Sequence, residues 1–185
     1  MATRLRSIGP AAAALVAALL LGACGPAGGP TAPPGGAVEP TQGPTRTVGP
    51  AVAQTRAELV RALGTKNLVL QDSQAQFRPP EDAQFTTTPR ALYQVILPKA
   101  PQEGFIVVYE FADPVRAAEA ATAQAAYLAT GPAKVQSPFG ARHIIRLVGP
   151  TVVLYSWVPA GAVDPLQPDI QTALETLGTG VPVPS

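Results

Sequence analysis

Apolar residues recur at the spacing of a helix face in three stretches of the chain, residues 52–64, 115–129 and 170–177. Side chains three and four positions apart lie on the same side of a helix, so each stretch predicts a helix with one buried face. Glycine stands at the end of two of them, at Gly64 and Gly178, where helices commonly stop. The middle stretch is rich in alanine, which favours helix and allows close packing on a sheet.

Five other stretches are rich in β-branched and aromatic residues, which predicts strands. They are residues 67–71, 91–97, 104–111, 141–148 and 151–158. Gly149-Pro150 separates the last two and predicts a tight hairpin turn. We therefore expect an α+β fold, a two-layer sandwich of about five mostly antiparallel strands with the three helices packed on one face. Residues 72–89 are polar and predict a long loop or a poorly formed edge strand.

The first 21 residues have the pattern of a secretory signal. Arg4 and Arg6 precede an uninterrupted apolar run at residues 11–21. A helix of that length spans about 16 Å, roughly half of a hydrocarbon core that is ~30 Å thick. The run is therefore too short for a permanent membrane helix and fits the apolar region of a signal peptide.

The signal-like segment ends in Leu21-Gly22-Ala23-Cys24, which resembles the lipobox of bacterial lipoproteins. The resemblance implies cleavage between Ala23 and Cys24 and a thioether-linked diacylglycerol on Cys24. The Cys24 acyl chains would then bind membrane lipid, and the protein would lie on the cell membrane or outer membrane, facing the periplasm or the cell exterior. The alternative is an ordinary cleaved signal that leaves Cys24 free. Because the chain has no second cysteine, that thiol would be exposed to oxidation.

Composition divides the chain into a signal peptide (1–23), a lipidated cysteine and tether (24–50), a globular domain (51–180) and a frayed tail (181–185). Residues 25–50 contain 7 Gly and 7 Pro among 26 residues. A segment of this kind buries too little apolar surface to offset its ordering entropy, so we expect a disordered tether. The alternative interpretation of its prolines is a ligand motif for a partner.

The charge balance argues against one class of partner. The chain has 13 basic and 12 acidic residues, and removal of Arg4 and Arg6 with the signal leaves 11 and 12, a net charge of −1. Nucleic-acid-binding domains carry a basic patch or stripe. We therefore expect no nucleic-acid partner. The sequence also has no Lys/Arg cluster of the kind that binds anionic lipid.

Three segments of the predicted domain also resemble a group of small bacterial lipoproteins. They read GFIVVYEFADPVRAAEAA, GPTVVLYSW and LETLG. The resemblance implies a single α+β domain behind a lipobox. It carries over no functional residue, because the shared positions are those of a core.

The sequence contains little that indicates catalysis. His143 is the only histidine, and zinc sites and catalytic triads need several partners around such a residue. The acidic pairs Glu81-Asp82 and Glu110 with Asp113 leave open a hydrolase whose carboxylates meet only on folding. No P-loop, dinucleotide fingerprint or nucleophile elbow is present. We name no catalytic residue, no metal site and no cofactor.

The aromatic residues are the other candidates. Tyr155 and Trp157 share one side of a predicted strand, and Tyr93 and Tyr109 fall in neighbouring strands. On a solvent-facing sheet they would form a binding platform, and under the alanine-rich helix they would fill the core, which we favour. The candidate binding surface comprises Tyr93, Tyr109, Phe139, Arg142, Tyr155 and Trp157.

The expected function is a non-catalytic binding or assembly module of the cell envelope, which holds an envelope protein near the membrane. Residues 72–89 and 137–142 are its candidate contact loops. The alternatives are the carboxylate-based envelope hydrolase and a carrier of a small apolar ligand, which needs a cavity.

Overall fold

The computed structural model describes residues 48–159 and 164–184. They belong to one compact unit, Gln42–Ser185. The predicted signal peptide, Cys24 and all of the predicted tether before residue 48 lie outside the described residues.

The centre of the domain is a six-stranded antiparallel sheet in the order β1-β2-β3-β5-β4-β6. The strands are β1 (Leu70–Asp72), β2 (Arg90–Val95), β3 (Phe105–Glu110), β4 (Arg142–Val148), β5 (Thr151–Trp157) and β6 (Thr179–Val181). β4 and β5 form the predicted hairpin, which turns at Gly149 with a φ of 55°. The α+β class and the antiparallel sheet are confirmed.

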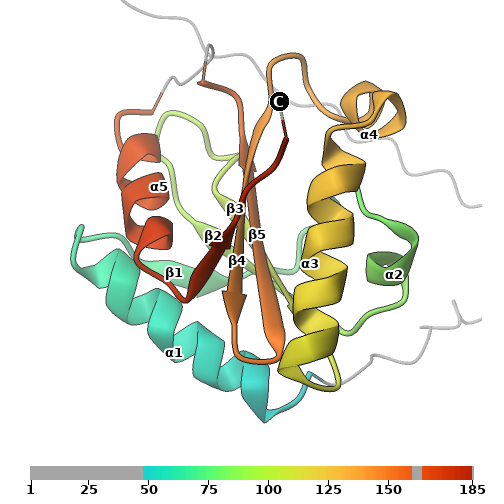
Figure 1. Cartoon of the computed structure of the whole chain (residues 1–185). Coiled ribbons are helices and arrows are strands. Elements are labelled where there is room, and N and C mark those ends of the chain that lie inside the picture. The colour runs from blue at the N-terminus through green and yellow to red at the C-terminus, as the bar shows by residue number, and fades with distance from the viewer. Residues whose placement is uncertain (1–47, 160–163, 185) are drawn as a thin grey trace, which may run out of the picture. The chain divides into compact units, whose positions relative to one another are not determined.

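Three substantial helices pack against this sheet, and two short ones lie in the connections. They are α1 (Pro50–Gly64), α2 (Ala83–Thr86), α3 (Pro114–Leu128), α4 (Gly131–Gln136) and α5 (Gln167–Glu175). The three helices were expected on one face of the sheet, and this is wrong. α1 and α5 cover one face and α3 covers the other (Figure 1).

Alternate side chains of the central strands explain the two covered faces. In β3, Ile106 and Val108 pack with α1 and α5, whereas Val107 and Tyr109 pack with the alanines of α3. The first five residues of both β3 and β5 are buried. Such a continuous apolar run is typical of a strand covered on both faces, so the sequence contained the signal for a third layer.

Two further expectations are corrected at the level of elements. Val181, placed in the frayed tail, belongs to β6 and pairs with Ile145 of β4. The long polar loop at residues 72–89 contains β1's last residue and α2, whose N-cap is the Asp82 side chain. α4, which begins at Gly131, is a short helix in a stretch for which the sequence predicted no element.

Candidate functional site

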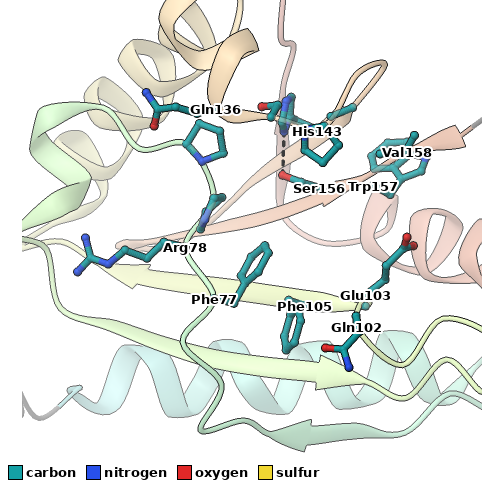
Figure 2. A pocket seen from close by; sticks show the side chains of 16 residues that line it. Phe77, Arg78, Gln102, Glu103, Phe105, Gln136, His143, Ser156, Trp157 and Val158 are labelled. Carbon is teal, nitrogen blue, oxygen red and sulfur yellow. Dashed lines mark hydrogen bonds between the residues drawn. The ribbon is translucent and has the colours of Figure 1, made fainter. Parts of the chain in front are cut away.

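A pocket of about 180 Å³ opens at the end of the sheet where β3 begins and β5 ends. It lies between residues 77–80, which precede α2, residues 102–105 at the start of β3, and residues 136–141, which link α4 to β4 (Figure 2). Its lining is mainly apolar: Phe77, Pro79, Pro80, Phe105, Pro138, Ala141, Trp157 and Val158. The polar side chains of the lining are Arg78, Gln102, Glu103, Gln136, Ser137, His143 and Ser156.

The floor of the pocket is a row of side chains across three neighbouring strands. Ser156 of β5 pairs with His143 of β4. Tyr155 pairs with Ile106 of β3, so the next position on each strand brings Phe105 level with Ser156. Side chains alternate along a strand, and this row therefore points to the face that α3 covers further along.

Stacked rings form part of the walls. Phe77 lies on Phe105 with ring centroids 4.7 Å apart and planes inclined by 19°. Trp157, which is half-buried, stacks on the buried Tyr155 at 5.5 Å and 11°. The Phe77–Phe105 stack lies on the side of the pocket floor and keeps an apolar surface in place for a ligand. Trp157 packs with Tyr155 on the α1 and α5 face and reaches the pocket at the end of β5.

His143 provides the main polar feature of the floor. Its Nδ1 lies 2.8 Å from the Ser156 Oγ, and burial lowers the pKa of the imidazole below its ordinary value of 6.5. The ring is therefore neutral at pH 7 and has one donor nitrogen and one acceptor nitrogen. Because Ser156 occupies Nδ1, the other nitrogen is the group that a ligand or water would bond.

Buried polar contacts hold the segment before α2 against α3. Gln124, fully buried in α3, donates from Nε2 to the Pro80 carbonyl at 2.7 Å and accepts from the Asp82 N–H at 2.7 Å. Pro79 and Pro80 are themselves buried. This wall of the pocket is thus part of the folded core rather than a loose loop.

Glu81 is the most strongly bonded carboxylate near the site. Its Oε1 accepts from Arg90 at 2.8 Å and from the Tyr109 hydroxyl at 2.7 Å, and its Oε2 accepts from Arg78 at 3.1 Å. The Glu81 side chain is 4 % exposed. Burial and the adjacent Glu81 carboxylate raise the pKa of Tyr109 far above its ordinary range, so the phenol stays a donor.

Two buried polar side-chain atoms have no hydrogen-bond partner among the described residues. They are the Tyr155 hydroxyl and the Gln167 Oε1. The Gln167 Nε2 donates to Glu103, a lining residue, at 2.8 Å. Burial raises the pKa of Tyr155, and Gln167 beside it acts in the opposite direction.

The structure divides the predicted binding surface. Tyr93 and Tyr155 are buried on the α1 and α5 face, and Tyr109 is buried on the α3 face. These three tyrosines are therefore core residues rather than parts of an exposed binding platform. Trp157 lines the pocket, whereas Phe139 and Arg142 are exposed beside it.

The sequence did not single out Phe77, Phe105 and Ser156 as site residues. Phe105 shares its strand parity with Tyr109 in the sequence, but its stack on Phe77 joins two segments that are separated by 27 residues, which include α2 and β2. The predicted contact loops at residues 72–89 and 137–142 do meet at the pocket, as its lining includes Pro79 and Pro138.

The carboxylates of the predicted acidic pairs have structural partners. Asp82 and Asp113 cap α2 and α3, and the Glu110 carboxylate accepts from the Gly49 N–H. Within residues 48–159 and 164–184, no three His, Cys, Asp or Glu side chains gather as a metal site would require. No helix in this part of the chain is long and apolar enough to cross a membrane.

Searches of family models, curated proteins and solved structures returned no match to this chain.

Proposed function

We propose that the chain is a lipid-anchored, non-catalytic binding module of the cell envelope, and that the pocket beside Trp157 is its binding site. The lipobox-like Leu21-Gly22-Ala23-Cys24 supports the anchor, as does the Gly/Pro-rich sequence behind it. The observation that carries the binding proposal is the pocket itself, whose apolar walls surround the neutral His143–Ser156 pair.

The size of the pocket indicates what it accepts. An apolar protein cavity of about 150 Å³ binds benzene. A pocket of about 180 Å³ therefore holds one aromatic ring or a branched chain of similar size. An aromatic side chain of an envelope protein fits this volume, and a polar group on that side chain would form a hydrogen bond with the free ring nitrogen of His143. The proposed partner inserts one such side chain.

The second candidate is a carrier of a small apolar ligand. The same pocket supports this function, because a free small molecule with a single ring would fill it without a partner protein. The two functions differ in what is found in the pocket in cells, a side chain of another protein or a separate small molecule.

Small probes test the pocket directly. We expect p-cresol, which carries the ring and hydroxyl of tyrosine, to bind with a Kd of about 1 mM, and toluene to bind more weakly because it lacks the hydroxyl. NMR shifts of the Trp157 indole and the His143 ring report binding, because each residue type occurs once in the chain. Ala141→Phe fills the pocket and should abolish the shifts, whereas Ala126→Phe on the exposed side of α3 should not. Equal shifts in both variants contradict the site.

Fractionation tests the anchor. We expect the wild-type chain to sediment with membranes and Cys24→Ser to lose the lipid and leave the membrane fraction. A Cys24→Ser form that still carries lipid, or a wild-type form that carries none, contradicts the anchor.

A further inference from the structure

We propose that the segment from α4 to the start of β4, residues 131–142, docks on an anionic bilayer. Val135 and Phe139 enter the headgroup region, and Lys134 and Arg142 face lipid phosphates. The proposal rests on the membrane attachment proposed above and names the surface of the domain that meets that membrane.

The first support is exposed apolar area. Phe139 is 101 % exposed and Val135 is 87 % exposed, the two highest values among the large hydrophobic residues that the structure describes. They stand four positions apart, and Pro138 between them lines the pocket. Large apolar side chains left in water within one short segment indicate a surface that another phase or molecule covers.

The Phe139 side chain stands on an ordered turn. The Ala141 N–H donates to the Pro138 carbonyl at 3.0 Å, which closes a four-residue turn with Phe139 at its second position. Gly140 follows with a φ of 77°, as the third position of a type II turn requires. The turn therefore presents Phe139 outward as part of its regular geometry.

Val135 is held in the same way by the rest of α4. Ala133 is fully buried, the Ser137 hydroxyl donates to its carbonyl at 2.9 Å, and the Gln136 amide donates to the Tyr127 hydroxyl at 2.9 Å. A helix so fixed loses little further conformational freedom when Val135 enters an interface.

The charge of the segment fits an anionic surface. The sequence has no Asp or Glu between Glu119 and Asp164, whereas Lys134 and Arg142 flank the two apolar residues. Neither cation forms an ion pair with any residue that the structure describes. Lys134 and Arg142 stand eight positions apart, so they form no cluster in the sequence, but each cation near an anionic surface contributes favourable binding free energy, which adds to that from insertion of the two apolar side chains.

The chain is long enough for this arrangement. Residue 48 enters α1 beside Glu110, at the opposite end of β3 from the pocket. β3 has six residues and spans about 20 Å. The 24 residues from Cys24 to residue 47 reach at most about 80 Å, so the domain can turn residues 131–142 toward the bilayer.

The test anchors the chain artificially, so that it does not depend on natural lipidation. Residues 24–185, which contain the compact unit, are coupled through Cys24, the only thiol, to a maleimide lipid in vesicles. The vesicles contain phosphatidylcholine with about 30 % phosphatidylglycerol and brominated acyl chains. We expect the tryptophan introduced by Phe139→Trp to emit at shorter wavelength, and to be quenched at least about twofold more, than the tryptophan introduced by Val115→Trp.

Val115 is the matched control, because it is 67 % exposed and lies at the start of the 15-residue α3, whose other end leads into α4. Both variants keep Trp157, so its emission cancels in the comparison. Lys134→Gln with Arg142→Gln should reduce the quenching of Phe139→Trp toward that of vesicles without phosphatidylglycerol. Equal quenching of Phe139→Trp and Val115→Trp overturns the proposal and leaves the segment as a protein-docking surface. The p-cresol and fractionation experiments test the proposed function independently of this result.

Discussion

At the residue scale, one carboxylate bonds the pocket wall to two strands of the sheet. Glu81 joins Arg90 of β2, the Tyr109 hydroxyl of β3 and Arg78 of the wall segment. In the sequence, Glu81 follows two prolines and precedes Asp82, a pattern typical of a solvent-exposed loop. Its burial depends on partners 9 and 28 positions away, and no local pattern reports such distances.

Removal of the Glu81 carboxylate should be costly. Glu81→Ala leaves the Tyr109 hydroxyl and the half-buried Arg90 without their acceptor, so we expect a loss of about 2–4 kcal/mol in the free energy of unfolding. Urea denaturation measures it. The exposed pair Arg116–Glu119 is the control, and Glu119→Ala should change stability by less than about 0.5 kcal/mol. A Glu81→Ala protein as stable as Glu119→Ala contradicts the network.

His143 predicts a pH dependence whose sign follows from burial. Its pKa is lowered in the folded chain from the ordinary 6.5, so below pH 6.5 the unfolded chain binds a proton that the folded chain does not. Stability should therefore fall as the pH drops from 7 through 6.5 toward the folded pKa. Urea midpoints at about pH 7 and pH 5.5 should differ more for wild type than for His143→Gln. An NMR titration of His143 with a midpoint above 6.5 contradicts this.

At the element scale, long periodic segments were predictable and short ones were not. The alanine-rich stretch at residues 115–129 was predicted as a helix, and the structure has α3 from Pro114 to Leu128 with the Asp113 side chain as its cap. α2, α4 and β6 have four, six and three residues. Elements of that length contain fewer than two full periods of the hydrophobic pattern, which is too little to identify them, and tertiary contacts such as Gln124 to Pro80 stabilise them.

The turn between α5 and β6 offers a prediction for an element that the sequence missed. Gly178 has a φ of 32°, and a Cβ there would lie 1.8 Å from the Leu147 carbonyl oxygen. Gly178→Ala should therefore displace β6 and cost at least about 2 kcal/mol in urea denaturation. Gly64→Ala is the control, because a Cβ there meets nothing within 4 Å, and its stability should be unchanged or slightly higher. If both variants unfold at the same urea concentration, the described turn is wrong.

At the scale of the whole molecule, the domain has two different ends. The chain enters α1 where Gly49 bonds Glu110 at the end of β3, and the pocket lies at Phe105 where β3 begins. Helices on both faces bury the middle of the sheet (Figure 1), and the pocket lies at the end of the sheet where β3 begins. The sequence indicated the sheet and its helices, but the second covered face and the pocket follow from how distant segments pack.

The central claim is that the pocket holds a side chain of an envelope protein, and photo-crosslinking in intact cells tests it most directly. A photoreactive amino acid replaces Gln102 on the pocket rim or, as a control, the exposed Thr122 of α3. We predict one predominant protein adduct from the Gln102 position of the Cys24-anchored form. The adduct should weaken in Cys24→Ser and disappear when Ala141→Phe fills the pocket. The same products from both positions, or a Gln102 adduct that survives Ala141→Phe, would contradict the account.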